Sequence, residues 1–456
     1  MASTYLERTP SSAGNRKTFT FSAWIKRNLV NATQQNLLAV SNATNDFSIF
    51  YIDTTESLTL NLTDNGSYSG LITTNRKFRD VSAWYHIVLA VDTTQATASD
   101  RVKIYVNGVQ ETSFSTSSYP SQNYEGLINT GLRMDISGQG SAWSSGTQGF
   151  DGLMSHIHFI DGTAYDASAF GEIDANGVWK IKTSPSVTYG TNGFFILKDG
   201  NSVTDQSGNG NNWTAGGTLT KTEDNPSNVF ATLNTLADNG MGGTYSYGNT
   251  QVQSQTSNRG FAIATLGASS GKWYWEIKTT ATGGTNPGDE WNYIGIATRP
   301  NAGSDNILGE SGTNSNKLYE YALYAPDGGV YNNGTKTAYA ASFTQGDTLS
   351  FALDLDNSRC YVAKNGLWCD SGAWSASTPT TYFSITSASS TPDGFYFPAF
   401  GDGGSNVNKT WQTNFGNGYF GTTAVASAGT NASGNGIFEY DVPTGYTALS
   451  TKGLNL

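Results

Sequence analysis

Short segments in which every second residue is apolar, separated by glycine-containing turns, most constrain the fold of this chain. In residues 19–26 (FTFSAWIK), Phe, Ala and Ile side chains alternate with polar or amphipathic ones, so a strand would place the two sets on opposite faces. Asn-Gly pairs at positions 107–108 and 365–366 follow two such segments, and this pair favours a two-residue β-hairpin turn. The pattern predicts an all-β protein with no helix longer than about three turns.

The composition agrees with a fold of short strands and many turns. The 456 residues include 53 Gly, and only 13% are charged. Long helices favour Ala, Leu, Glu and Lys, whereas this chain is rich in Thr, Ser, Gly, Asn and Tyr. The length suffices for two or three domains, because a large sandwich fills about 200 to 250 residues.

Four expected strands organise the first part of the chain, at residues 19–26, 84–92, 102–106 and 150–161. Their order resembles the laminin-G-like, concanavalin-type jelly roll. The resemblance covers residues 1–165. It implies a two-sheet sandwich, closed by the last of these strands.

Residues 166–236 are expected to form an ordered connector that packs on the first domain. Residues 193–198 (GFFILK) have the character of a strand. Residues 205–213 (DQSGNGNNW) resemble a turn found near strand ends in laminin-G-like jelly rolls.

A second β domain is expected over residues 237–420, followed by a C-terminal tail at 421–456. Its segments are GKWYWEIK (271–278), YIGIATR (293–299), GDTLSFALDLD (346–356), CYVAKNGLW (360–368) and YFPAFG (396–401). This order resembles a SPRY (B30.2-type) domain. Both families share the concanavalin-like architecture, so the resemblances imply two tandem β-sandwich (jelly-roll) domains.

The two ends of the chain carry a further resemblance. The run ASTYLERTPSSAGNRKTFTFSAWIKR (2–27), the SPRY-like second half and PTGYTALSTKGL (443–454) together resemble virion proteins of tailed phages, particularly marine ones. This resemblance implies a structural or adhesion protein on the virion surface, as a head decoration, head fibre or tail appendage. The implied partners are capsid or tail proteins and host surface glycans, and a homo-oligomer is expected.

Charge and hydropathy argue against two other classes of partner. The net charge is -11, and no cluster of Lys or Arg offers a surface for phosphates, so nucleic acid binding is not expected. No stretch approaches the roughly 20 apolar residues of a membrane helix, so membrane insertion is not expected. The polar start does not resemble a signal peptide, and release by cell lysis would explain an exterior location.

Catalysis is the first rival to binding, because some concanavalin-like folds are glucanases. Those enzymes carry Glu-x-Asp-x-x-Glu on one strand, which aligns the carboxylates for acid and nucleophile roles. The nearest match begins at Glu172 and Asp174, but Gly177 occupies the third position, beside an expected turn. We therefore expect a solvated loop at this position and no enzyme activity.

Two groups of residues have side chains that could bind a metal ion, although no cofactor is expected. His156 and His158 flank one residue of an expected strand, so both side chains would lie on one face and could chelate a metal with a third ligand. The favoured alternative is that both are exposed polar residues without a metal. Asp205, Asn209 and Asn211 could supply oxygen ligands to calcium, whereas Asx-turns that satisfy their own backbone are commoner.

Cys360 and Cys369 flank the second Asn-Gly turn. A two-residue loop pairs Lys364 with Leu367 and makes the two cysteines diagonal neighbours, about 7 to 8 Å apart. That separation favours two buried thiols over a disulfide.

Aromatic residues in polar segments give the positive signal for ligand binding. Sugars bind by stacking on aromatic faces beside hydrogen-bonding groups, which makes such residues candidate glycan ligands. The candidates are Trp143, Trp291, Tyr321, Trp368 and Trp374. The alternative is that each aromatic ring fastens its loop to the sandwich. The competing functions are a bacterial carbohydrate-binding protein, a glycan hydrolase and a peptide-binding module.

Overall fold

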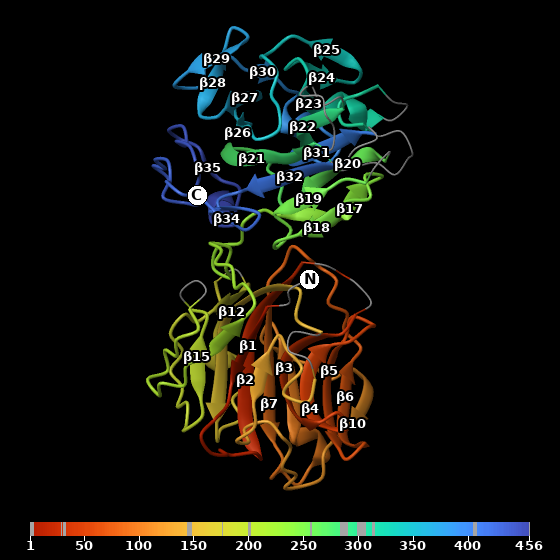
Figure 1. Cartoon of the computed structure of the whole chain (residues 1–456), viewed down its shortest axis with the longest axis vertical. Coiled ribbons are helices and arrows are strands. Elements are labelled where there is room, and N and C mark those ends of the chain that lie inside the picture. Colours follow the sequence, from red (N-terminus) through yellow and green to blue (C-terminus); the bar gives the residue numbers. More distant parts are fainter. Residues whose placement is uncertain are drawn as a thin grey trace. The chain divides into compact units, whose positions relative to one another are not determined.

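The computed structural model describes residues 4–28, 30, 33–143, 148–175, 177–198, 202–255, 258–282, 291–298, 307–311, 315–404 and 408–455. The chain divides into two compact units, Met1–Lys221 and Thr222–Leu456 (Figure 1). Throughout the described residues the helical segments are short 3-10 turns of three to five residues, and strands form the rest of the regular structure. The predicted all-β class is confirmed.

The first unit is built mainly from two antiparallel sheets (Figure 1). The eight-stranded sheet has the order β10 (Phe114–Ser118), β6 (Ser67–Thr74), β5 (Leu58–Asp64), β4 (Asp46–Ile52), β3 (Gln35–Ala43), β11 (Met134–Ile136), β1 (Tyr5–Arg8), β16 (Thr214–Gly216). The six-stranded sheet has the order β15 (Phe194–Ile196), β12 (Gly152–Asp161), β2 (Thr18–Arg27), β7 (Tyr85–Asp92), β8 (Val102–Val106), β9 (Val109–Gln110). A two-stranded hairpin of β13 (Gly171–Ile173) and β14 (Trp179–Ile181) completes this unit.

The alternation predicted for residues 19–26 places one face of β2 in the main core of the first unit. Phe19, Phe21, Ala23 and Ile25 belong to a hydrophobic cluster that also contains residues of the eight-stranded sheet. The opposite face of β2 is buried as well, with Thr20, Ser22, Trp24 and Lys26 all at most 5% exposed. A second layer of chain therefore covers this sheet.

That second layer comes from the segment assigned to a connector. Phe170 and Ala167 pack in a small cluster with Val88 and Ile160 from the outer face of the sheet. Farther along, β15 pairs with β12 and β16 pairs with β1, so this segment adds an edge strand to each sheet. Residues 166–221 are thus part of the first unit, whereas 222–236 belong to the second.

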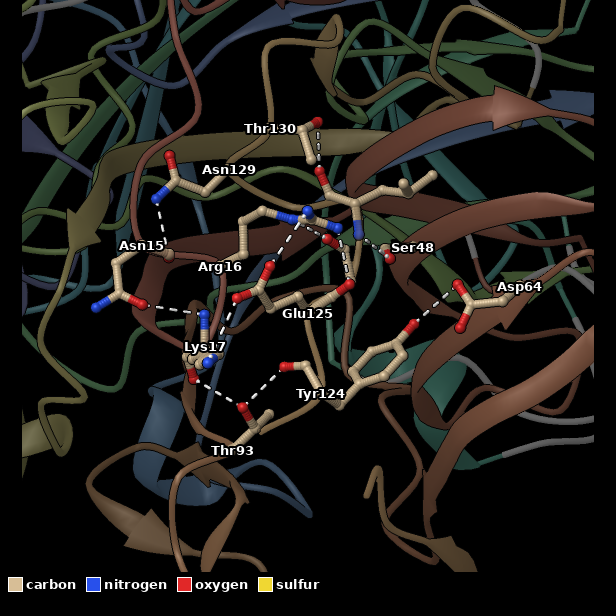
Figure 2. A network of polar contacts seen from close by, with 12 residues as sticks. Asn15, Arg16, Lys17, Ser48, Asp64, Thr93, Tyr124, Glu125, Asn129 and Thr130 are labelled. Atoms are coloured by element: carbon tan, nitrogen blue, oxygen red, sulfur yellow. Dashed lines mark hydrogen bonds and ion pairs between the residues drawn. The ribbon is translucent and has the colours of Figure 1, made fainter. Parts of the chain in front are cut away.

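A network of polar contacts holds residues 124–130 in place within the first unit (Figure 2). The Arg16 guanidinium donates to the backbone oxygen of Glu125 at 2.8 Å and lies 3.4 Å from its carboxylate. The Tyr124 hydroxyl donates to Asp64 at 3.1 Å, which ties the same segment to β5. Because these groups satisfy one another, the network has a structural role.

The second unit also contains two large sheets (Figure 1), which are antiparallel except where β35 pairs with β21 in parallel. The first has the order β17 (Leu233–Asn239), β20 (Arg259–Ala264), β31 (Phe397–Gly403), β22 (Asn292–Ala297), β23 (Tyr321–Tyr324), β24 (Val330–Asn332), β25 (Thr335–Thr337). The main path of the second is β18 (Thr244–Ser246), β19 (Gln251–Gln253), β32 (Lys409–Asn414), β21 (Lys272–Thr282), β26 (Thr348–Asp354), β27 (Arg359–Lys364), β28 (Leu367–Asp370), β29 (Ala373–Ala376). Off this path, β30 (Phe383–Ser384) pairs with β27 and β35 (Thr447–Ala448) with β21, while β33 (Tyr419–Phe420) and β34 (Thr423–Ala424) pair separately.

The segment assigned to a C-terminal tail is built into the second unit. Phe438, Tyr446 and Ala448 form a buried cluster with Tyr274 of β21 and Trp368 of β28. Residues 438–448 therefore cover part of the outer face of the larger sheet.

Glu276 fastens this covering segment to β21. Its carboxylate accepts backbone N–H groups of Glu439 and Tyr440, both at 2.8 Å, together with the Tyr274 hydroxyl and the Asn414 amide. Burial raises the pKa of Glu276 to about 7, while the backbone donors from Glu439 and Tyr440 act in the opposite direction. A charged residue in the middle of a strand is thus stabilised by the segment that excludes water from it.

Both Asn-Gly turns have the predicted conformation. Asn107 and Gly108 have φ of 48° and 83°, and Asn365 and Gly366 have φ of 52° and 81°. Positive φ at both central residues defines the type I′ turn. The predicted pairing of Lys364 with Leu367 is confirmed, and the two cysteines are buried free thiols.

Candidate ligand-binding groove

An open groove of about 560 Å³ lies on the second unit, where β26 and β27 meet the C-terminal segment. Arg359 and Tyr361 line it from β27, Lys272 and Asp354 from the neighbouring strands, and residues 441–446 from the C-terminal segment. Ser377, Thr378 and Pro379 add a polar side. The groove therefore combines aromatic, charged and hydroxyl-bearing groups.

The alternation of β27 determines which side chains reach the groove. Cys360 and Val362 point into the main core of the second unit. Tyr361 and Ala363 lie on the opposite face, where Ala363 is buried beneath the C-terminal segment and Tyr361 is half-buried. The groove thus opens at the edge of the area that the C-terminal segment covers.

Three aromatic rings and one guanidinium give the groove its shape. Tyr446 is 7% exposed and Trp368 only 4% exposed, so Tyr361 has the most accessible ring of the three lining the groove. Tyr361 makes an edge contact with Tyr382, at 5.5 Å between ring centroids, and the Arg359 guanidinium stacks 4.4 Å from the Tyr382 ring centroid. These contacts hold the groove side chains in fixed positions.

Both aspartates that line the groove are held in the ionised form. Burial acts to raise the pKa of Asp354, but hydrogen bonds from Asn357 and the ammonium of Lys272 at 3.2 Å bring that pKa below its usual value. The backbone N–H and hydroxyl of Thr430 lower the pKa of Asp441. A glycosidase needs one carboxyl group that stays protonated to act as a general acid. Two ionised carboxylates suit hydrogen bonding to ligand hydroxyls instead.

Burial leaves little accessible surface on two of the predicted aromatic ligands. Tyr321 begins β23 and is 7% exposed, with its hydroxyl hydrogen-bonded to Thr386. Trp368 lies within β28 and lines the groove, but it is only 4% exposed. Both were assigned to polar loops because nearby turn residues dominate their local sequence, whereas strand pairing places them in hydrophobic clusters.

Trp374 fastens its own segment to the sandwich. Its indole N–H donates to the backbone oxygens of Ala341 at 3.1 Å and Ser342 at 3.3 Å. The Lys364 ammonium lies 5.9 Å from the ring centroid. These contacts favour the anchoring alternative for Trp374.

Trp143 and Trp291 keep exposed surface but lie in different units. Trp143 contacts Phe47 edge to face at 5.4 Å in the first unit. Trp291 is 36% exposed, has φ of 77° and packs beside Gly403. The Gly288-Asp289-Glu290 run before it lies outside the described residues. The five predicted aromatics therefore do not form one site.

Arg359, Tyr361 and Tyr446 are the groove residues that the sequence argument missed. Tyr361 lies within the expected segment 360–368, Arg359 directly precedes that segment, and Tyr446 lies in the expected C-terminal tail. The alternation of the strand could have identified Arg359 and Tyr361. If Cys360 and Val362 face the core, the residues between and beside them point to the opposite face.

The proposed calcium ligands form a self-satisfied turn. The Asp205 carboxylate accepts the backbone N–H groups of Phe195, Ser207 and Asn211 at 2.8 to 2.9 Å, and the Ser207 hydroxyl at 2.8 Å. The amide groups of Asn209 and Asn211 donate to the backbone oxygen of Gly193. A calcium ion would have to displace these donors, so the geometry favours Asx-turns, and calcium binding stays a prediction.

The expectation that His156 and His158 are exposed on one face is wrong. The register shifts between Ser155 and His158, and His156 has φ of 47°, so a bulge interrupts the alternation. His158 is 2% exposed, stacks 4.0 Å from the Phe195 ring centroid and contacts the Tyr189 hydroxyl at 2.9 Å. Over the described part of the chain, no three His, Cys, Asp or Glu side chains form a metal-binding group.

The segment compared with glucanase motifs is a hairpin rather than a loop. Glu172 lies in β13, and Asp174 accepts the Val178 backbone N–H and pairs with Lys180 at 2.7 Å. Asn176, at the expected turn, lies outside the described residues. Asp174 thus closes the hairpin between β13 and β14.

The described sheets make this an all-β protein of concanavalin-like β-sandwich architecture. Residues 2–168 match the model of a laminin-G family described as the Concanavalin A-like lectin/glucanases superfamily. A fold of this type suggests carbohydrate binding or adhesion.

Solved structures similar to the chain include SPRY domains and a pentraxin. The SPRY domain of human HERC1 is 19% identical, with a TM-score of 0.31, over 40% of this chain and 96% of that one. A human SPRY domain is 16% identical, with a TM-score of 0.25, over 36% and 91%. The heptameric SAP-like pentraxin of Limulus polyphemus is 15% identical, with a TM-score of 0.26, over 36% and 78%.

Within the ranges that the structure describes, no helix is long and apolar enough to span a membrane.

Proposed function

We propose that this protein is a glycan-binding adhesion protein displayed on the surface of a tailed-phage particle. The lectin-type fold supports the carbohydrate-binding part of this proposal. The resemblance of both chain ends to tailed-phage virion proteins supports the location. Capsid or tail proteins and further copies of the chain are the proposed partners on the particle.

The groove on the second unit is the observation that carries the proposal. Tyr361 offers a half-exposed ring on which a sugar can stack. Asp354 and Asp441 offer ionised acceptors for sugar hydroxyls, and Asn357 and Thr444 add neutral polar groups. Such a groove buries little ligand, so the affinity of one site is expected in the range of about 1 mM to 1 μM.

Many copies on one particle would compensate for weak single sites. Simultaneous engagement can raise avidity by about 10² to 10⁴ without any new contact. Whole particles are therefore expected to bind host cells far more tightly than isolated chains, and equal binding would contradict the proposal of multiplicity.

The binding experiment uses the full chain and polysaccharide extracted from the surface of the bacterial host. Calorimetric titration should show binding that Tyr361→Ala weakens at least tenfold, because the stacking surface is lost. Tyr68→Ala is the matched control, since it removes a tyrosine ring that is 66% exposed in the first unit. Unchanged affinity in Tyr361→Ala would exclude the groove as the binding site.

The location is tested by imaging virions with a labelled antibody against the chain. Labelling of heads or tails is expected. Glycan binding without virion labelling would favour the alternative, a bacterial carbohydrate-binding protein. Release of reducing sugar from the polysaccharide would instead favour a glycan hydrolase.

A further inference from the structure

The groove holds an arginine that contacts tyrosine side chains and is attracted by Asp354, but forms no close ion pair with a described carboxylate. Arg359 stands directly opposite Asp354 in the pairing of β26 with β27. The Asp354 carboxylate nevertheless engages Lys272 and Asn357. Among the described residues, no carboxylate oxygen lies within 4.0 Å of the Arg359 guanidinium nitrogens. This guanidinium is therefore available to an external anion.

The position of the Arg359 guanidinium is fixed by stacking. Its central carbon lies 4.4 Å from the centroid of the Tyr382 ring. Stacking uses a face of the planar group and leaves the in-plane N–H donors at its edge for a ligand. A guanidinium held in this way loses less rotamer freedom when it binds an anion.

A platform for a sugar ring lies two residues farther along the same strand. Tyr361 shares the outward face of β27 with Arg359, because alternate residues of a strand point the same way. Both side chains are half-buried and line the groove. A hydrogen-bond donor for an anion and a stacking surface for a sugar ring thus lie side by side.

We infer that the groove binds an acidic saccharide, with the sugar carboxylate on Arg359 and the sugar ring on Tyr361. This inference rests on the proposed glycan-binding function and names the class of glycan. A carboxylate fits the planar fork of a guanidinium through two parallel hydrogen bonds. Asp354 and Asp441 also line the groove, and they would repel a doubly charged phosphate more strongly than a singly charged carboxylate. Carboxylate sugars such as uronic acids are therefore the preferred ligands.

The test compares ligands that differ only in their carboxyl groups. The full chain is titrated with the host polysaccharide before and after chemical reduction of its carboxyl groups, and with tetragalacturonate and its methyl ester. Each acidic form is expected to bind at least about tenfold more tightly than its neutral counterpart, the size of one charge-assisted contact. The preference should weaken as salt increases.

Variants of Arg359 test whether this side chain causes the preference for the acidic saccharide. Arg359→Gln should abolish the preference for the acidic form and preserve binding of the neutral form. Arg359→Lys keeps the charge without the fork, so it should retain part of the preference. Arg79→Gln, which removes an exposed arginine of the first unit, is the matched control and should change nothing. Melting temperatures establish that each variant is folded.

The outcomes separate this inference from the function on which it rests. Equal binding of the acidic and neutral polysaccharides, with both lost in Tyr361→Ala, would overturn the carboxylate assignment and leave glycan binding in place. An acid preference that persists in Arg359→Gln would also overturn it. Absence of binding to every saccharide would overturn the proposed function as well.

Discussion

Acidification is expected to destabilise the first unit through a histidine that is folded in its neutral form. The His86 ring lies between Trp24 and Trp179, with centroid distances of 4.9 and 5.8 Å. The Trp179 indole N–H donates to Nδ1 at 3.1 Å, and Nε2 contacts the Ser22 hydroxyl at 2.9 Å. Because Nδ1 accepts a hydrogen bond, a second proton on the ring would break that contact. Burial lowers the pKa of His86 to about 3.

The magnitude follows from the difference between the folded and unfolded pKa values. Between pH 6.5 and about 3, the unfolded chain binds a proton at His86 that the folded chain does not. The free energy of unfolding therefore falls by about 1.4 kcal/mol per pH unit in this window, or about 2 kcal/mol at pH 5. Burial also lowers the pKa of His158 well below its usual value, so that residue adds a loss of the same sign.

Two measurements on the full chain test this prediction. The chain contains 3 histidines, so selective ring labelling gives few NMR signals, and the His86 signal should not titrate between pH 8 and 5. Hydrogen exchange of peptides from β2 and β7 should show unfolding free energy decreasing over the same range. His86→Gln should flatten that slope by about 1.4 kcal/mol per pH unit. A His86 midpoint near 6.5, or protection that does not change with pH, would refute the reasoning.

Three further predictions concern the second unit. Burial raises the pKa of Glu276 to about 7, so this residue should add up to about 1.4 kcal/mol of stability per pH unit as pH falls from 7 to 4.5. Hydrogen exchange of β21 peptides would measure this gain in unfolding free energy. The same gain in Glu276→Gln would show that Glu276 is not the titrating group. Gly366→Ala should lower the melting temperature more than the control Gly346→Ala. Both glycines have positive φ, but only at Gly366 would the new Cβ lie 2.6 Å from the Tyr440 ring. Equal losses of melting temperature in the two variants would exclude that contact. Thiol titration of denatured, unreduced protein should find two reactive groups per chain, and finding none would reveal a disulfide.

Local sequence was sufficient wherever one strand and its turn determine the structure. The alternation of residues 19–26 and the two Asn-Gly turns predicted β2, the hairpin of Lys364 with Leu367, and the positive φ of Gly366. These features depend on side-chain period and backbone sterics, which a short window of sequence contains. The bulge at His156 was not predictable in this way, because it depends on the partner strand and on Leu197, whose backbone oxygen accepts the His156 N–H.

The candidate groove was hidden from the sequence because it depends on contacts between distant segments. Glu276 lies 163 residues from Glu439 in sequence, yet the hydrogen bond between them fixes where the C-terminal segment crosses β21. That crossing buries Ala363 and Trp368 but leaves Arg359 and Tyr361 at its margin. Alternation alone predicts that Arg359, Tyr361 and Ala363 share one face of β27, but it cannot tell which of them the segment covers. Exposure, and with it the capacity to bind, is therefore set by the path of the C-terminal segment rather than by the character of the strand.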